Sequence, residues 1–173
     1  MSQRLAPSHS RQTHAPQLNL CVLGSGSGGN STVIRLNGKA LLLDAGFGPR
    51  TTAQRLTQLD MQPADIAAIV LTHLDTDHFR PTWIRTCVEH RIRVFVHDWH
   101  LPMLAELENI DELHQAGLIQ PFNLTAFKPW DDSQLTLTPV ACRMMTKAPS
   151  ATASTARAGR SALPPTWAVY LSL

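Results

Sequence analysis

The apolar residues that follow the polar N-terminal segment fall into short, separate runs. The runs at 18–24 (LNLCVLG), 32–36 (TVIRL) and 40–46 (ALLLDAG) are rich in Leu, Val and Ile and too short for helices, which is typical of strands. The pair Asn37-Gly38 between the second and third runs predicts a tight hairpin. We therefore expect a three-stranded start in which a two-residue turn joins the last two strands.

Further along, 66–73 (IAAIVLTH) is continuously apolar, which predicts a strand buried on both faces, with Ile69, Val70 and Leu71 inside the core. The run 92–96 (IRVFV) predicts another strand. The stretch 134–139 (QLTLTP) alternates in the manner of a half-buried strand.

Three helices are predicted between these strands, at 49–59, 81–90 and 99–107, and the first two begin with Pro. The order of strands and helices indicates an α/β layered domain. We expect one mixed sheet with helices packed on one of its faces.

Composition sets the limits of this domain. A chain of 173 residues, 43% of them hydrophobic, suits one domain at 17–142. Residues 1–16 are polar and predict a disordered N-terminus. From residue 143 onward Ala, Ser and Thr dominate without apolar periodicity, so 143–173 is expected to be an unstructured tail.

Charge and cysteine content exclude several classes of protein. The net charge of +2 arises in the tail, which has four basic and no acidic residues, so the body is slightly acidic and lacks a strong nucleic-acid-binding patch. No apolar run is long enough for a membrane span, and no secretory signal is visible, which favours a cytoplasmic protein. The three cysteines are unclustered and predict neither a disulfide framework nor a cysteine zinc site.

The loop Gly24–Gly29 matches the dinucleotide pattern G-x-G-x-x-G. That pattern requires a helix directly afterwards, whereas a strand is predicted here. We therefore interpret the loop as a tight backbone turn in which Asn30 or Ser31 forms stabilising hydrogen bonds. Nucleotide binding through Gly24–Gly29 is a second alternative function.

The densest group of candidate ligands follows the buried strand, where His73, Asp75, Asp77 and His78 lie within six positions. In extended geometry residues 73, 75 and 77 would share one face, and His78 would turn toward them. Nitrogen and oxygen donors of this kind suit Zn²⁺, Mn²⁺ or Fe²⁺. The spacing predicts a metal site at the end of this strand.

The segment THLDTDH resembles the H-x-H-x-D-H signature of the metallo-β-lactamase-fold (MBL-fold) hydrolases, and LGSGSGGNS and LLLDAG resemble the start of their nuclease and phosphodiesterase branch. The resemblance implies an αββα sandwich, of which 17–142 would be the N-terminal half. It also implies two divalent ions, zinc first and manganese or iron as alternatives. His73 and Asp75 would bind one, and Asp77 and His78 the other. Asp stands at position 75 where the family usually has His, which leaves the metal open.

By the same resemblance, the reaction would be hydrolysis of a phosphodiester or other small ester by a metal-bound hydroxide, with Asp77 as the catalytic residue. Ligands expected from the second half are not found. His90, His97, His100 and His114 are interpreted as surface or packing residues, and no acidic residue follows Asp132. The chain as given is therefore expected to bind metal weakly and to be inactive. A non-catalytic fragment with at most one weak metal site is the first alternative.

The tail suggests a reason for the missing ligands. Read one base earlier, codons compatible with residues from Arg143 onward encode HDDEGTVGYR, and those for 164–168 encode ATDLG. Both resemble later metal motifs of the family. We therefore hypothesise that the C-terminal part is truncated or out of frame. The sequence leaves the substrate and the oligomeric state open.

Overall fold

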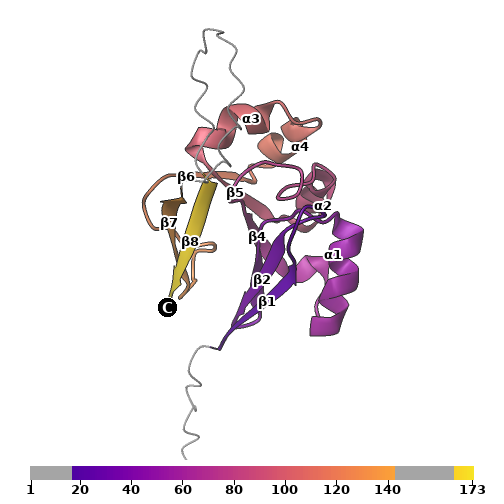
Figure 1. The fold of residues 1–173 in the computed structure, drawn as a ribbon, viewed down its shortest axis with the longest axis vertical. Helices are drawn as coiled ribbons and strands as arrows, with labels where there is room; N and C mark the ends of the chain where they lie inside the picture. The colour runs from indigo at the N-terminus through magenta and orange to yellow at the C-terminus, as the bar shows by residue number, and fades with distance from the viewer. Residues whose placement is uncertain (1–16, 143–165) are drawn as a thin grey trace, which may run out of the picture.

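A six-stranded sheet forms the centre of the computed structural model, which describes residues 17–142 and 166–173 (Figure 1). The strands follow one another in the sheet as they do in sequence: β1 (Leu18–Gly24), β2 (Ser31–Leu36), β3 (Lys39–Leu43), β4 (Ile66–Val70), β5 (Arg93–His97) and β6 (Ile119–Phe122). Pairing is antiparallel from β1 to β3 and parallel from β3 to β6. The predicted mixed sheet is confirmed.

The predicted hairpin lies between β2 and β3, where Leu36 pairs with Lys39. Asn37 and Gly38 both adopt positive φ, at 49° and 85°, the conformation that a tight two-residue turn requires. Ile69, Val70 and Leu71 are completely buried, as their composition predicted.

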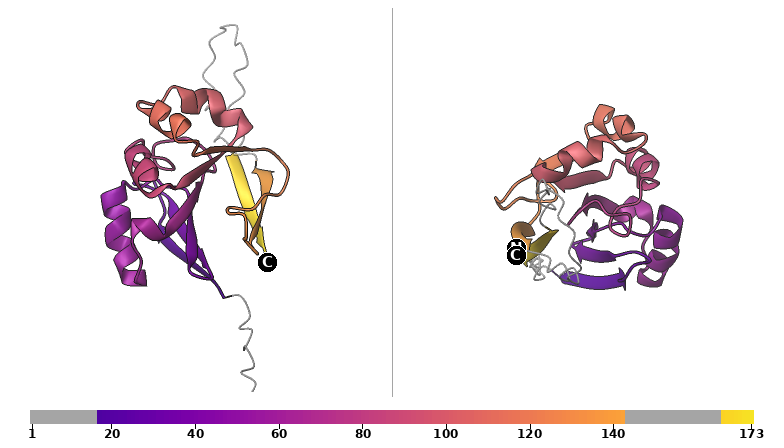
Figure 2. Two further views of the ribbon diagram at one scale, coloured as in Figure 1. Left: turned by 180° about the vertical axis from the view of Figure 1, so that it is seen from behind. Right: turned by 45° about the horizontal axis from the view of Figure 1, so that its top comes forward.

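The helices cover one face of the sheet (Figures 1 and 2). They are α1 (Pro49–Leu56), α2 (Trp83–His90), α3 (Leu101–Ala105) and α4 (Ile110–Gln115), with short 3₁₀ turns η1 (Thr57–Leu59), η2 (Pro63–Asp65) and η3 (Asp98–His100). Leu42, Ile69 and Val94 of the sheet belong to the same buried cluster as Leu56 and Trp83 of the helices. Removing this apolar surface from water is what holds the helical layer in place.

The opposite face of the sheet is covered by a second, two-stranded sheet of β7 (Thr136–Cys142) and β8 (Thr166–Ser172). Ile34, Val70 and Phe95 form a second buried cluster there with Trp130 and Leu137. Among the described residues no helix covers the outer side of β7 and β8 (Figure 2). The described chain thus shows three layers, α, β and β, of the expected αββα sandwich.

The prediction of an unstructured tail is wrong for residues 166–172. These residues form β8, which pairs with β7 from Thr136↔Ser172 to Cys142↔Thr166. The reason is the alternation in TWAVYLS: Val169 and Leu171 pack against the second cluster while Tyr170 faces outward. The other disorder predictions and most of the reading-frame hypothesis concern residues 1–16 and 143–165. Those residues lie outside the part of the chain that the structure describes.

The direction of the parallel strands determines where the functional side chains can lie close together. Because β3, β4 and β5 run in the same direction, their carboxyl ends meet at one edge of the sheet. β2 is antiparallel to β3, so its amino end lies at that edge too. Within the described parts of the chain, no helix has the length and apolar character needed to span a bilayer.

Candidate metal centre

Four segments bring polar side chains to the carboxyl edge of the sheet. Asp44 follows β3, the loop 71–82 follows β4, η3 follows β5, and Asn30 precedes β2. Asp44 N donates to Val70 O at 2.9 Å and Leu71 N donates to Phe95 O at 2.9 Å, so the sheet pairing continues just past the strand ends. The first residues after each strand therefore lie side by side.

The loop after β4 does not stay extended. His78 N and Phe79 N both donate to Asp75 O, at 2.8 and 2.9 Å, which closes a turn. This turn brings His78 back beside His73, with 3.6 Å between the ring centroids. His73, Asp77 and His78 then offer ligand atoms that all lie within 4.8 Å of one another. Three of the four predicted residues thus meet through a turn and not on one face of an extended strand.

Asp44 is a site residue that the sequence analysis did not single out. Its buried carboxylate accepts hydrogen bonds from Thr72 N at 2.9 Å and Thr72 Oγ1 at 2.8 Å, and its Oδ2 lies 2.8 Å from His78 Nδ1. An Asp directly after the buried run ALLL was the signal that could have identified it, since the same signal identified His73.

The contact with Asp44 determines the position of the proton on the His78 ring. A carboxylate only accepts, so His78 Nδ1 carries the proton that it donates to Asp44. The Thr72 hydroxyl donates to Asp44, and its oxygen lies 3.0 Å from His73 Nδ1. In the neutral ring of His78 the Nε2 atom consequently has a lone pair, and Asn30 Nδ2 lies 3.0 Å from it. A carboxylate behind a histidine is the usual way of orienting a metal ligand.

Asn30 holds Asp77. Asn30 Nδ2 donates to Asp77 Oδ2 at 3.0 Å and lies 3.0 Å from His78 Nε2, while Asn30 Oδ1 accepts from Gly26 N at 2.9 Å. The predicted role of Asn30 in stabilising the glycine loop is confirmed, and the same side chain also reaches the site. We call Asp44, Asn30, Asp77 and His78 the His78 side of the centre.

Gly46 permits the close approach of the two loops. Its N donates to Asn30 O at 2.9 Å, and a Cβ at this position would lie 1.8 Å from Asp77 O. No side chain fits there, so Gly46 is the residue that lets the loop after β3 touch the loop that carries Asp77.

Asp75 lies apart from this group. Its Oδ2 is 3.6 Å from His73 Nε2, but its side chain is 70% exposed and its carboxylate is not within reach of the Asp77–His78 pair. We call His73, Asp75 and the buried His100 of η3 the His73 side. The predicted assignment of His73 and Asp75 to one ion, and of Asp77 and His78 to another, matches this separation but stays a prediction.

Burial and charge shift the histidine pKa values in opposite directions. Burial lowers the pKa of His73, and the neighbouring His78 lowers it further. Burial also acts to lower the pKa of His78, but the hydrogen bond to Asp44 and the charges of Asp44, Asp77 and Asp75 outweigh it, so its pKa is raised. The carboxylates therefore favour a cation at His78.

The residues at this edge fit a divalent metal ion. The three donors within reach are two imidazoles and one carboxylate, a set that suits zinc and other first-row ions. Asp44 behind His78 supplies the outer hydrogen bond that metal-binding histidines generally have. His73, Asp77 and His78 would hold such an ion.

The other histidines fall into two groups. His90 and His114 are exposed, whereas His97 and His100 are buried at 7% and 1% exposure. His97 Nδ1 accepts from Trp99 N at 3.1 Å, and its ring packs edge-on against Phe122. The two ring nitrogens of His100 have no hydrogen-bond partner among the described residues. Burying such groups without a hydrogen-bond partner costs about 1–3 kcal/mol of folding free energy. A role in packing alone does not explain why a polar ring lies there.

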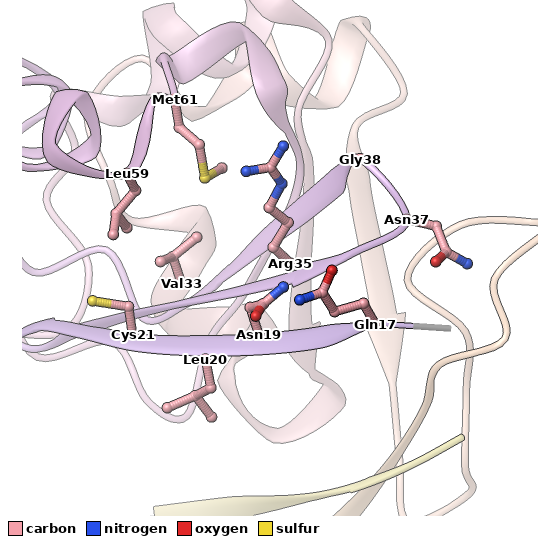
Figure 3. A pocket seen from close by; sticks show the side chains of 10 residues that line it. All are labelled: Gln17, Asn19, Leu20, Cys21, Val33, Arg35, Asn37, Gly38, Leu59 and Met61. Carbon is pink, nitrogen blue, oxygen red and sulfur yellow. The ribbon is translucent and has the colours of Figure 1, made fainter. Parts of the chain in front are cut away.

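A wide cavity of about 1080 Å³ lies away from this centre. Figure 3 shows Arg35 of β2 beside Asn19 and Val33, with Leu59 and Met61 closing one side. Its lining comes from β1, β2 and the segment after α1, and none of it from the loop that carries His73 and His78. The candidate metal centre and this cavity are therefore separate features.

The glycine loop leads directly into β2, not into a helix. Gly26 and Gly29 adopt positive φ, and Gly29 N donates to Gly26 O at 3.0 Å, which makes a tight turn. Without a helix N-terminus the loop lacks the feature by which the dinucleotide motif holds a pyrophosphate.

Comparison with known proteins agrees with this geometry. Residues 24–80 match the sequence model of the metallo-beta-lactamase superfamily. The metallo-beta-lactamase fold protein YhfI from Bacillus subtilis superposes with a TM-score of 0.54 over 91% of this chain and 58% of its own, at 12% identity. Residues 24–80 thus resemble the metallo-β-lactamase superfamily in sequence, and the described chain has the metallo-β-lactamase fold.

Two curated relatives match part of this chain. Exodeoxyribonuclease WalJ of Streptococcus pneumoniae is 39% identical over 57 residues, 33% of this chain and 21% of the relative. Exodeoxyribonuclease YycJ of Bacillus anthracis is 35% identical over 63 residues, 36% of this chain and 24% of the relative. The match thus spans about a fifth to a quarter of each relative's length.

Proposed function

We propose that this metallo-β-lactamase-fold chain is a metal-dependent hydrolase of phosphodiester bonds and that it acts on nucleic acid. The observation that carries the proposal is the convergence of ligand atoms of His73, His78 and Asp77, with Asp44 behind His78. The names of the matched exodeoxyribonucleases support phosphodiesters as the substrate class.

Each residue of the His78 side has a separate role in the proposed reaction. Asp44 keeps the His78 ring in one tautomer and one orientation, with Nε2 turned toward Asp77, 3.6 Å away. Asn30 orients the Asp77 carboxylate through its 3.0 Å hydrogen bond. Asp77 is then placed to bind metal and to accept a proton from an attacking water.

A divalent ion at these residues would supply Lewis-acid polarisation of the phosphodiester and would make a nearby water more acidic. Zinc is the first candidate and manganese or iron the alternatives, because an N₂O donor set accommodates each of them. With a single ion bound, His73, Asp77 and His78 would hold it. With two ions, which the proposal includes, His73 and Asp75 would hold one and Asp77 and His78 the other, because His73 can offer its nitrogen to only one ion.

Metal titration of the purified chain tests this function. Isothermal calorimetry with Zn²⁺ and Mn²⁺ should show weak binding, and Asp77→Ala should reduce the affinity at least tenfold because it removes one of three donors. Asp131→Ala is the matched control, since that side chain is fully exposed and lies in another part of the chain. Equal affinities of wild type and Asp77→Ala would contradict the proposed site.

Hydrolysis of bis(p-nitrophenyl) phosphate and of single-stranded DNA gives the second readout. We expect at most slow turnover, because the second-half ligands that the resemblance implies are not found in the sequence. Any turnover should require added metal and disappear in Asp77→Ala. Metal binding that depends on Asp77 without any turnover would favour the non-catalytic alternative, in which the fold keeps a metal site and no activity.

A further inference from the structure

His100 is the feature of this edge that the proposed function does not use. Its ring is 1% exposed, and neither Nδ1 nor Nε2 has a hydrogen-bond partner among the residues that the structure describes. His73 and His78, by comparison, each have Nδ1 within hydrogen-bond distance of a neighbouring side chain, and His78 Nε2 lies 3.0 Å from Asn30 Nδ2. A buried imidazole with two unused nitrogens is poorly explained as packing, because an apolar side chain would fill the space at lower cost.

The fold brings His100 to the metal centre. β4 and β5 are parallel neighbours, and Leu71 N donates to Phe95 O, so the segments after the two strands leave the sheet together. His100 ends η3, three residues after β5, while His73 lies three residues after β4. The charge of His100 interacts with those of His73 and Asp75, which agrees with this placement.

The His73 side lacks a ligand. His73 Nε2 and Asp75 Oδ2, 3.6 Å apart, are the two donors that the sequence motif supplies there. A zinc-type ion is generally held by about three protein ligands. The superfamily signature has His at the position of Asp75, so this chain offers one imidazole fewer than the signature does.

We propose that His100 is a metal ligand that acts with His73 and Asp75, so that two imidazoles and one carboxylate bind a divalent transition-metal ion on the His73 side. The inference rests on the proposed metal-dependent function and adds a residue to its site. Burial lowers the pKa of His100, and His97 and His73 lower it further, so the ring stays in the neutral form that binds metal.

A cysteine variant tests direct coordination. His100→Cys replaces imidazole by a thiol that binds cobalt as a thiolate, and sulfur bound to Co²⁺ gives a near-ultraviolet charge-transfer absorption. The full chain is titrated with up to two equivalents of Co²⁺, and His114→Cys serves as the matched control because His114 is exposed on α4. The native cysteines 21, 87 and 142 are present in both variants and set the background. We expect the absorption in His100→Cys alone.

A leucine variant gives the second measurement. His100→Leu should weaken binding of Co²⁺ on the His73 side at least tenfold, while His114→Leu binds as wild type does. A circular-dichroism spectrum equal to that of wild type establishes that His100→Leu is folded, and the cysteine variant decides the question if it is not. Wild-type affinity in His100→Leu, or no new absorption in His100→Cys, would overturn the role of His100.

The same variants distinguish failure of the His100 proposal from failure of the proposed metal-dependent function. If Asp77→Ala loses metal binding while His100→Leu and His100→Cys behave as the controls do, the proposed function stands and His100 is a packing residue. If wild type binds no Co²⁺ at all, the proposed function and the role of His100 both fail.

Discussion

The two sides of the metal centre differ in how completely the protein satisfies its own polar groups. On the His78 side, hydrogen bonds of 2.8–3.0 Å join His78 to Asp44 and join Asn30 to Asp77 and His78. On the His73 side, Asp75 is exposed and His100 has no partner among the described residues. One side is organised by the fold alone, whereas the other has donors whose partner would be an ion.

This difference has opposite consequences for stability and for binding. Satisfied buried hydrogen bonds contribute to folding, and they also place ligands before the ion arrives. Buried nitrogens without a hydrogen-bond partner cost folding free energy, and binding of an ion offsets this cost. Substituting a residue of the His78 side should therefore lower the free energy of unfolding, whereas substituting His100 should not.

The largest effect is expected at Asp44. Asp44→Ala leaves Thr72 and the Nδ1 of His78 without their buried acceptor, so the free energy of unfolding should fall by about 3 kcal/mol. Urea unfolding followed by tryptophan fluorescence measures it. Asp132→Ala is the control, since that carboxylate is exposed and pairs only with Lys39 at the surface, and its midpoint should be unchanged. An equally stable Asp44→Ala variant would show that the His78 side is not organised by folding.

A smaller loss of stability is expected when Gly46 is substituted. Gly46→Ala places a Cβ 1.8 Å from Asp77 O, so the loops after β3 and β4 must separate, at a cost of about 1–3 kcal/mol. Metal affinity should fall with it, because Asp77 is displaced. Gly28→Ala is the matched control: its Cβ would meet nothing within 4 Å. Similar melting temperatures and metal affinities for the two variants would contradict this account.

The sequence predicted the frame of the molecule because local patterns encode it. Continuous apolar runs identified β4 and the strands beside it, and Asn37-Gly38 identified the hairpin. β6 was missed because it has only four residues and contains Pro121, which an edge strand tolerates. β8 was missed because the composition of the tail concealed a short alternating stretch.

The candidate site was predictable to the extent that its residues are close in sequence. His73, Asp77 and His78 lie in one loop, and their spacing alone indicated a metal site. Asp44 and Asn30 reach the site through sheet pairing, which joins segments that are about 30 to 50 residues apart. The place of His100 depends on the register of β5 against β4, which no local pattern reveals.

His100→Leu should have little effect on the metal-free protein, and the expected sign is opposite to that of Asp44→Ala. Replacing a buried ring without hydrogen bonds by an apolar side chain of similar size should raise the free energy of unfolding by up to about 1 kcal/mol. Urea unfolding in the presence of a chelator measures it. A loss of more than about 2 kcal/mol would indicate that His100 supports the fold, as the residues of the His78 side do.

The smallest effect is expected in the pH dependence of the metal-free protein. Asp44, Asp77 and Asp75 face His78 and raise its pKa above 6.5, whereas burial lowers the pKa of His73 and of His100 below 6.5. The stabilisation from His78 is thus present below pH 6.5 and is lost as the pH rises through its folded pKa. His73 and His100 act in the opposite direction, because the unfolded chain takes up their protons first as the pH falls below 6.5.

These contributions partly cancel, so the titration of each ring is a sharper measurement than overall stability. Nuclear magnetic resonance of the imidazole protons, with chelator present, should show His78 with a pKa above 6.5 and His73 and His100 with pKa values below it. In Asp44→Asn the pKa of His78 should move down, because the neutral amide removes the nearest charge that favours the imidazolium. A pKa of His78 that is insensitive to this substitution would mean that Asp44 does not organise the ring, and the contrast between the two sides would lose its physical cause.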